Sequence, residues 1–291
     1  MELWYTEQHS DDVKFSLRVG KQLYAGRSEF QDICVYNSDE FGNFLTLDGY
    51  LMLTEKDEHI YHEMITHVPM AVNPGVANVL VIGAGDGGTV RELVRYKSVE
   101  RIDLVEIDRE VVEVCKKFFP TMTSGLSDPR VRLFFEDGLR FIRSHSNEYD
   151  LIIVDSTDPF GPGEGLFSKE FYGNCQNALT QDGILVNQHE SVFYREYAAA
   201  MRKIHGLLNG LFPICRVYQA HIPTYPSGHW LFGFASKKYD PLRDLSGTWN
   251  NLGIATKYYN QELHKGCFAL PNSVIEQLEG AERTEGAGGR R

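Results

Sequence analysis

The spacing of apolar residues changes near residue 56 and divides the chain into two parts. Before this point, apolar and polar residues form strand-like runs at 15–24, 30–36 and 43–53. The last run contains Asp48-Gly49, a dipeptide typical of two-residue hairpin turns, so we expect it to fold back on itself. The pattern predicts a small antiparallel β unit at the N-terminus.

A helix is expected to connect this β unit to the rest of the chain. The stretch from Thr54 to Asp57 resembles a helix capping box with Asp in place of Glu. Ile60, Met64 and Val68 then recur at helical spacing. The period of the pattern therefore changes from strand to helix at this boundary.

After residue 75, short apolar runs alternate with helical patterns. The expected strands are 79–82, 102–105, 131–135, 151–154 and 184–186, and the expected helices are 89–96, 109–118, 139–143 and 168–179. This alternation is typical of an α/β fold with a doubly wound parallel sheet. Two further runs, 216–222 and 230–236, flank a loop with two prolines and a glycine and are expected to pair as antiparallel strands.

These patterns predict three segments along the chain. Residues 1–56 form an N-terminal β-strand domain, and residues 57–279 form a Rossmann-like catalytic domain. Residues 280–291 are small and charged, a composition that predicts a disordered tail.

Charge and cysteine content narrow the class of protein. Lys and Arg number 29 against 40 Asp and Glu, a net charge of -11, which disfavours nucleic acid or an anionic membrane surface as a partner. The five cysteines are scattered without a Cys-x-x-Cys pair, which suits free thiols in a reducing compartment. No secretory signal or membrane-spanning stretch is apparent, so we expect a soluble cytoplasmic protein.

A glycine-rich loop, Gly83-Ala84-Gly85-Asp86-Gly87-Gly88, follows the expected strand 79–82. Glycines at such a turn let the backbone approach a ligand closely, and Gly83, Gly85 and Gly88 also match the spacing of a dinucleotide fingerprint. Asp86 disfavours that interpretation, because its carboxylate would repel a pyrophosphate and attract a cation. The loop therefore favours an adenosine-containing ligand that carries positive charge.

Acidic residues end the other expected strands as well. Glu106 lies at the spacing at which such folds place an acid on ribose hydroxyls, and Asp137, Asp155 and Asp158 follow the next two strands. A helix N-cap would explain any single Asp. Five acids in successive turns at one sheet edge instead predict a binding site for ligand cations or for a metal.

The sequence lacks the usual motifs for a zinc or magnesium site and for catalysis by a nucleophilic serine or cysteine. His62-Glu63 is followed by three residues before His67, where the zinc helix motif has two. A magnesium site on the Asp pair would lack a phosphate-cradling Lys. The chain contains no Gly-x-Ser-x-Gly elbow and no cysteine beside a histidine in sequence.

Several segments in order along the chain match one known family. They are Leu47-Asp48-Gly49, Thr54-Glu55-Lys56-Asp57-Glu58, Tyr61-His62-Glu63-Met64, the glycine-rich loop, Val105-Glu106-Ile107-Asp108, residues 155–165 and residues 222–228. With these segments, the chain resembles the spermidine synthases, the polyamine aminopropyltransferases, in their bacterial form, over nearly its whole length. The resemblance implies transfer of the aminopropyl group of decarboxylated S-adenosylmethionine to putrescine, giving spermidine and 5'-methylthioadenosine. It also implies a methyltransferase-like Rossmann sheet, no cofactor or metal, and a homodimer or homotetramer held partly by the N-terminal domain.

The resemblance also implies roles for individual residues. The donor would be held by Gln31, Gly83, Gly85, Asp86, Glu106, Asp137, Gly138 and Pro162, with Asp86 at its terminal ammonium. The diamine would be held by His62, Asp86, Asp155, Asp158, Gln188 and Tyr225. Asp155 with Tyr61 would receive the proton of the attacking amine, and residues 156–167 would close over the substrates. Met52 and Ala84 depart from a glutamine and a glycine common in the family.

Two other functions share these features. A methyltransferase would use the same sheet, glycine loop and Glu106, although Asp86 and the segment 155–158 favour aminopropyl transfer. The chain could also be a protein that binds a polyamine or a nucleoside without catalysing a reaction. Such a protein would not be expected to retain both Asp155 and Tyr61, and both are present. The acceptor stays open among putrescine, cadaverine, agmatine and spermidine, which differ in length and end group.

Overall fold

The computed structural model describes residues 2–156 and 161–288, except for the side chains of residues 161–162, 164 and 282–288. Asp158 lies outside the described residues, and of Pro162 only the backbone is described. The expected closing segment 156–167 is therefore described only in part.

The N-terminal part consists of two antiparallel units, as the alternating pattern predicts. Strands β1 (Leu3–Ser10) and β2 (Val13–Val19) form a hairpin, and β3 (Lys21–Arg27), β4 (Asp32–Ser38), β5 (Gly42–Leu47) and β6 (Tyr50–Thr54) form a four-stranded sheet. Asp48 and Gly49 join β5 to β6 with φ of 48° and 82°, values typical of a two-residue hairpin turn. The run 15–24 is not one strand, because the chain breaks at Gly20 and enters the other sheet.

A seven-stranded sheet forms the centre of the larger part of the described chain. Its strands are β7 (Asn78–Gly83), β8 (Arg101–Glu106), β9 (Val131–Phe135), β10 (Tyr149–Asp155), β11 (Leu179–Gln188), β12 (Ile214–His221) and β13 (His229–Ser236), in the order β12-β13-β11-β10-β7-β8-β9. Only β13 pairs in the antiparallel sense, with β11 and β12. The order reverses between β7 and β10, where doubly wound sheets open a ligand crevice.

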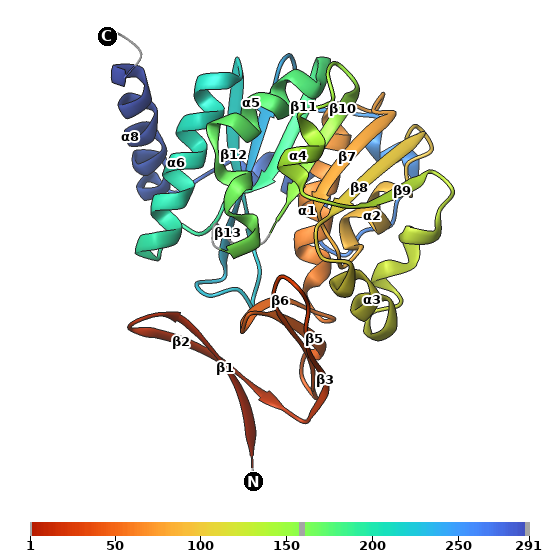
Figure 1. Cartoon of the computed structure of the whole chain (residues 1–291). Coiled ribbons are helices and arrows are strands. Elements are labelled where there is room, and N and C mark those ends of the chain that lie inside the picture. Colours follow the sequence, from red (N-terminus) through yellow and green to blue (C-terminus); the bar gives the residue numbers. More distant parts are fainter. Residues whose placement is uncertain (1, 157–160, 289–291) are drawn as a thin grey trace.

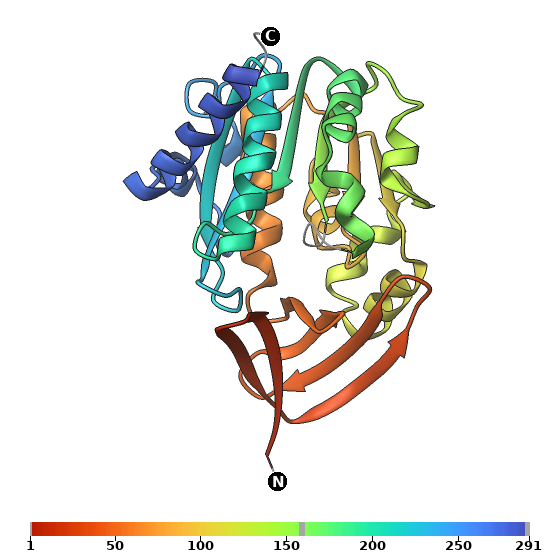
Figure 2. The same ribbon diagram turned by 60° about the vertical axis from the view of Figure 1, so that its left-hand side comes forward.

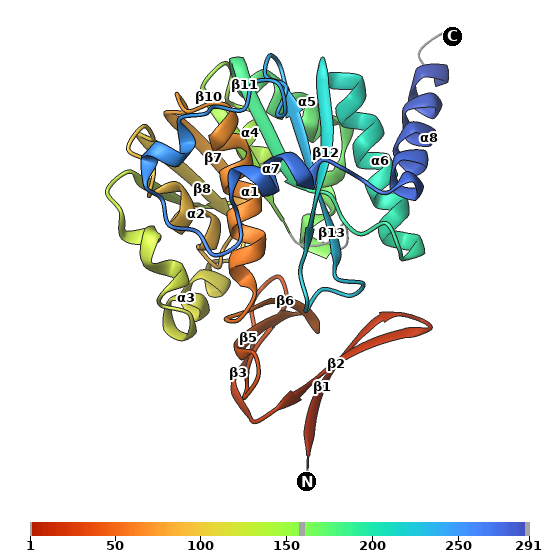
Figure 3. The same ribbon diagram turned by 180° about the vertical axis from the view of Figure 1, so that it is seen from behind.

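Helices cover both faces of this sheet (Figures 1 and 3). Their bounds are α1 (Glu58–Val72), α2 (Gly88–Leu93), α3 (Arg109–Phe118), α4 (Gly138–Ile142), α5 (Lys169–Ala178), α6 (Arg195–Leu211), α7 (Gln261–Cys267) and α8 (Asn272–Gly288), with short 3-10 helices η1 (Met122–Ser127), η2 (Gly161–Phe167) and η3 (Trp249–Leu252). Alternation along β7 explains the two layers: Val79 and Val81 pack with α1 and α2, whereas Leu80 and Ile82 pack with α4, α5 and α6.

Two features differ from the sequence prediction. Helices α6, α7 and α8 were not predicted, although Met201, Ile204 and Leu208 bury one face of α6. The tail expected to be disordered from residue 280 continues as part of α8 as far as Gly288. Ala281 in this segment is buried, and Ala, Glu and Arg are strong helix formers.

The N-terminal strands lie across the edge of the large sheet at which the parallel strands end (Figures 1 and 2). Ile33, Val35 and Leu45 pack there against Val111 and Cys115 of α3 in one apolar cluster. Burial of this cluster fixes the small sheet over the crevice, so both parts of the chain contribute walls to one cavity.

Candidate active site

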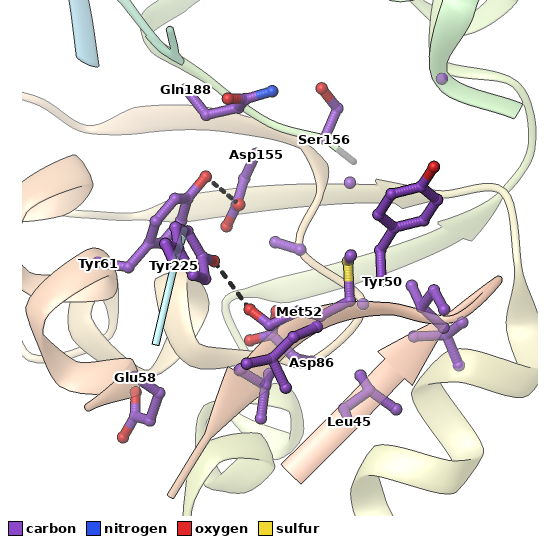
Figure 4. A pocket seen from close by; sticks show the side chains of 18 of the residues that line it. Leu45, Tyr50, Met52, Glu58, Tyr61, Asp86, Asp155, Ser156, Gln188 and Tyr225 are labelled. Atoms are coloured by element: carbon purple, nitrogen blue, oxygen red, sulfur yellow. Dashed lines mark hydrogen bonds between the residues drawn. The ribbon is translucent and has the colours of Figure 1, made fainter. Parts of the chain in front are cut away.

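The cavity lies between the N-terminal strands and the carboxyl ends of β7, β8, β10 and β11. Its lining includes Gln31, Met52, Tyr61, His62, Gly83, Gly85, Asp86, Glu106, Asp137, Gly138, Asp155, Gln188 and Tyr225. The structure therefore gathers, around one opening, the site residues predicted from sequence whose side chains it describes. Figure 4 shows Asp155, Tyr61, Gln188 and Tyr225 around the same space.

The glycines of the loop are required by close packing of the protein itself. Gly83 has a φ of 86°, and a Cβ there would lie 2.0 Å from the carbonyl oxygen of Asp155. A Cβ on Gly85 would lie 2.8 Å from Oε2 of Glu106. Ala84 has a φ of 59° and donates its backbone N–H to the Asp155 carbonyl at 2.9 Å. The loop thus brings Asp86, Glu106 and Asp155 together across three strand ends.

Asp155 is held by two hydroxyl groups. Tyr61 of α1 donates to Oδ1 at 2.8 Å (Figure 4), and Thr89 of α2 donates to Oδ2 at 2.6 Å. Burial and the nearby charge of Asp86 raise the pKa of Asp155 to about 6. Burial also raises the pKa of Tyr61, so this phenol keeps its proton as a donor. The arrangement orients a carboxylate whose basicity is greater than that of an exposed Asp.

His62 lies between two carboxylates. Its Nδ1 is 2.6 Å from Glu58 Oε2, and its Nε2 is 3.1 Å from Asp86 Oδ1. Burial alone would lower the pKa of His62, but Asp86 and Glu58 raise it to about 10. The imidazole is therefore a cation paired with Asp86. A Cβ on Gly88 would lie 2.3 Å from its ring, which explains the glycine at that position.

Glu58, which also lines the cavity, extends this network to Arg91. Arg91 donates to both of its carboxylate oxygens, at 2.8 and 3.0 Å. Burial would raise the pKa of Glu58, but hydrogen bonds and charge from His62 and Arg91 hold it at about 2. The pairing of Glu58 with Arg91 fixes the carboxylate that holds Nδ1 of His62, and the other ring nitrogen of His62 contacts Asp86.

The second strand end places three residues in one hydrogen-bonded group. Glu106 accepts the backbone N–H of Asp108 at 2.8 Å, and burial raises the pKa of Glu106 to about 7. Gln31 donates its amide to Asp108 Oδ2 at 2.9 Å. Asp108 also caps α3 through the N–H of Glu110 at 3.0 Å, so it orients Gln31 as well as the helix. Sequence reasoning did not assign Asp108 this position.

Asp137 and Gly138 follow β9. Asp137 caps α4 by accepting the N–H of Leu139 at 2.8 Å, so the plain helix-cap interpretation holds for this residue even though it also lines the cavity. A Cβ on Gly138 would lie 2.5 Å from Cγ2 of Ile82, which requires glycine at this turn.

The loop after β12 contributes Tyr225. Its hydroxyl donates to the backbone carbonyl of Met52 at 2.8 Å, and its ring lies 4.7 Å from that of Trp230 (Figure 4 shows the hydrogen bond). Because the backbone rather than the side chain of Met52 makes this contact, the departure at Met52 leaves the hydrogen bond in place.

The expected capping box at Thr54 is wrong. Helix α1 begins at Glu58 with Asp57 as its N-cap, and Asp57 makes no side-chain cap. The carboxylate of Asp57 accepts instead from Thr54 Oγ1 at 2.6 Å and from the N–H and hydroxyl of Thr224 at 3.0 and 2.7 Å. This buried group therefore ties strand β6 to the loop that carries Tyr225.

Sequence reasoning missed the wall contributed by β1. Glu7 and His9 line the cavity together with Tyr50 and Tyr197. Glu7 accepts the N–H of Leu51 at 2.9 Å and lies 2.9 Å from His9 Nδ1, and the His9 ring stacks on Tyr197 at 4.5 Å. Glu7 and His9 lie in the polar run from Thr6 to Ser10, so nothing in the local pattern indicates that their side chains are the buried ones.

The histidine motif beside the site has a structural role. Glu63 accepts the backbone N–H groups of Lys257, Tyr258 and Tyr259 at 2.7–2.8 Å. His67 lies 3.2 Å from Glu92. Among the described residues, no group of three or more His, Cys, Asp or Glu side chains is arranged to hold a metal ion. Within residues 2–156 and 161–288, no helix is long and apolar enough to cross a membrane.

Two family models match the chain. The Spermine/spermidine synthase domain matches residues 58–245, and the Spermidine synthase tetramerisation domain matches residues 3–55. Among curated proteins, the chain is similar to the polyamine aminopropyltransferases of Clostridium perfringens and Alkaliphilus oremlandii. Each is 68% identical to it over 97% of this chain and 100% of the relative.

Solved structures give the same result. A spermidine synthase in complex with the transition state analogue AdoDATO has a TM-score of 0.93 and 40% identity over 95% of both chains. The spermidine synthase from Thermotoga maritima has a TM-score of 0.91 and 39% identity, over 95% of this chain and 94% of that chain.

Proposed function

Because this chain belongs to the spermine/spermidine synthase family and is a polyamine aminopropyltransferase, we propose that its donor is decarboxylated S-adenosylmethionine and its acceptor is putrescine. The products are spermidine and 5'-methylthioadenosine. The family assignment disfavours the two alternative functions of the glycine loop and Glu106, namely a methyltransferase and a catalytically silent binder.

The observation that carries this proposal is the position of Asp155. Its carboxylate is fixed by Tyr61 and Thr89 at the cavity wall, with Asp86 close enough to raise its pKa. A primary amine with a pKa near that of lysine, ~10.4, must lose a proton before it can attack, at a cost of roughly 4–5 kcal/mol at pH 7. A buried carboxylate with a raised pKa is suited to receive that proton.

The reaction then proceeds as one displacement. The amine lone pair attacks the carbon next to the sulfonium, and a C–N bond forms as the C–S bond breaks. The electron pair of the broken bond stays on sulfur, which leaves as a neutral thioether, and the proton of the attacking ammonium resides on Asp155. Since the leaving group is neutral, the enzyme mainly aligns two cations that repel each other.

The remaining acids divide between the two substrates. Glu106 is proposed to bind the ribose hydroxyls, and Gln31, Asp137, Gly138 and Pro162 are proposed to surround the adenosine. Asp86 faces the terminal ammonium of the donor, and His62 holds Asp86 in place. His62, Asp158, Gln188 and Tyr225 are proposed to line the acceptor channel.

The displacement makes no demand on a metal or a further cofactor, because no oxyanion develops. We propose that activity is unchanged after treatment with a chelator. Matched assays before and after dialysis against EDTA check this, and loss of turnover that added Mg²⁺ restores would contradict it.

The protein is proposed to act as a homodimer or homotetramer. The match to the tetramerisation model covers β1, on which Leu3 and Trp4 are each 53% exposed in the single chain. These two exposed apolar side chains at the start of the hairpin are available to a neighbouring subunit. Light scattering of the purified protein distinguishes a dimer from a tetramer.

A product assay tests the proposed function. Purified protein is incubated with decarboxylated S-adenosylmethionine and, separately, with putrescine, cadaverine, agmatine or spermidine, and the products are identified by mass. We expect spermidine and 5'-methylthioadenosine in equal amounts, with putrescine the best acceptor. A higher kcat/KM for another amine would reassign the acceptor, and methylation of an amine by S-adenosylmethionine would overturn the proposal.

A further inference from the structure

Glu190 is a buried acid just behind the acceptor side of the cavity. It follows β11 by two residues, and its exposure is 0%. It does not line the cavity, whereas Gln188 does. Gln188, Asp155 and Tyr61 line the same cavity (Figure 4). The neighbours of Glu190 therefore decide what this acid contributes.

Glu190 makes two hydrogen bonds to the same amide. Gln188 Nε2 donates to Oε1 of Glu190 at 2.7 Å, and the backbone N–H of Glu190 donates to Gln188 Oε1 at 3.2 Å. A carboxylate only accepts and a backbone N–H only donates. If the Gln188 amide were flipped, its oxygen would face the Glu190 carboxylate and its NH₂ group would face the backbone N–H of Glu190. Neither pair can form a hydrogen bond, so Glu190 selects the observed orientation of the amide.

The backbone at Glu190 has an uncommon conformation. Its φ is 69°, in the left-handed region that costs free energy for a residue with a Cβ. The segment is fixed on both sides by β13, since His189 donates its N–H to Leu231 at 2.8 Å and Leu231 donates to the Glu190 carbonyl at 3.1 Å. A glycine would adopt this conformation without strain, so the side chain of Glu190 has to offset the cost.

We propose that Glu190 is a positioning residue for the acceptor amine, acting through Gln188. By fixing the amide, it turns the remaining lone pair of Gln188 Oε1 toward an ammonium in the cavity beside Asp155. This inference rests on the proposed function, because it takes Gln188 as a contact of the acceptor.

A double-mutant cycle tests this coupling. Glu190→Gly, Gln188→Ala and the double variant are assayed for acceptor KM, kcat and affinity for 5'-methylthioadenosine. Glu190→Gly relieves the strained φ and removes the carboxylate. We expect it to raise the KM for putrescine about tenfold, a typical effect of losing a hydrogen bond to a charged group. In the Gln188→Ala background the same change should have no further effect, and nucleoside affinity should stay within about twofold.

A second variant separates orientation from charge. Glu190→Gln removes the charge but keeps an oxygen that can accept from Gln188 Nε2, so its KM should stay within about threefold of wild type. Glu196→Gln, an exposed acid in α6, is the matched control for loss of one negative charge. If Glu190→Gly does not fold, Glu190→Asn replaces it, since Asn tolerates positive φ and its shorter side chain falls short of Gln188.

The outcomes are distinct. Spermidine formation by wild type with an unchanged KM in folded Glu190→Gly would overturn this inference and leave the proposed function intact. Additive effects of Gln188→Ala and Glu190→Gly on the acceptor KM would also overturn it. The same holds if the KM of Glu190→Gln is as high as that of Glu190→Gly. No aminopropyl transfer to any amine by wild type would instead contradict the proposed function.

Discussion

Nε2 of His62 lies 3.1 Å from Oδ1 of Asp86, and the opposite ring nitrogen contacts Glu58 at 2.6 Å. Asp86 is therefore an acid that already has one cationic partner inside the protein. Arg91 pairs with Glu58 on the other side of the group, so the terminal ammonium of the donor would be a second cation at Asp86. This relationship leads to predictions on donor choice and on stability.

Replacing Asp86 by Asn is expected to narrow the preference for the decarboxylated donor over S-adenosylmethionine. The latter places a carboxylate on the same carbon, and two like charges about 4 Å apart interact by roughly 4 kcal/mol at an effective dielectric of about 20. In competition binding, wild type should prefer the decarboxylated donor to S-adenosylmethionine by about 100-fold. In Asp86→Asn, this ratio of affinities should be smaller by a factor of at least about ten. Asp137→Asn is the matched control, because Asp137 caps α4 and should affect both compounds alike. An unchanged ratio in Asp86→Asn would place donor selection elsewhere.

The His62 network predicts a pH-dependent contribution to stability. The pKa of His62 is raised from 6.5 to about 10, so its stabilisation is complete below pH 6.5 and is lost as pH rises through 10. The pKa of Glu58 is lowered from 4.5 to about 2, so its stabilisation is complete above pH 4.5 and is lost as pH falls toward 2. The Tm difference between wild type and His62→Gln should therefore be largest at pH 4.5–6.5 and shrink toward pH 10. A constant difference between pH 6 and pH 10 would show that His62 is neutral in the folded protein.

Glu106→Gln is expected to weaken 5'-methylthioadenosine binding roughly tenfold at pH 8, because charge-assisted hydrogen bonds to the ribose hydroxyls are lost. Burial raises the pKa of Glu106 to about 7, so wild-type affinity should also fall as pH decreases below 7. Titration calorimetry at pH 6 and pH 8 measures both effects. Equal affinity of wild type and variant at pH 8 would make Glu106 a structural acid at the strand end.

Asp57→Ala is expected to destabilise the fold by about 3 kcal/mol, because three buried hydrogen bonds from Thr54 and Thr224 are lost. It should also raise the KM for the acceptor, since Thr224 precedes Tyr225 in the cavity wall. Thr54→Val removes only the hydrogen bond on the β6 side and should leave that KM within about twofold. Urea unfolding measures the change in stability, and acceptor kinetics measure the change in KM. Equal acceptor KM values for Asp57→Ala and wild type would show that Asp57 does not position the loop that carries Tyr225.

Local sequence signals predicted the elements that define the site. Asp48-Gly49 predicted its hairpin because the turn requires positive φ at both residues, and the loop from Gly83 to Gly88 predicted the sheet edge. The strand break at Gly20 was not predicted, although the alternation of apolar residues stops at Val19 and resumes only at Leu23, because the pattern does not show that the chain changes sheets there.

Partners distant in sequence set the rest of the site. Thr89 holds Asp155 across 66 positions, and Thr224 pairs with Asp57 across 167. Glu7 reaches the cavity only because β1 lies across the ends of the large sheet. Such contacts follow from the packing of whole elements, which no window of sequence reveals.

We propose that Asp155 receives the proton of the attacking amine. Asp155→Asn keeps the shape of the side chain and can still accept from Tyr61 or Thr89, but it removes the base. Thr89→Val is the control, because it removes one hydrogen bond and retains the carboxylate.

The decisive measurement is kcat for spermidine formation by Asp155→Asn at saturating substrates, alongside its Kd for 5'-methylthioadenosine. We expect a kcat lowered about 100-fold or more with a Kd within a few-fold of wild type, since loss of a general base typically costs 10² to 10⁴. A kcat within about threefold of wild type would contradict it.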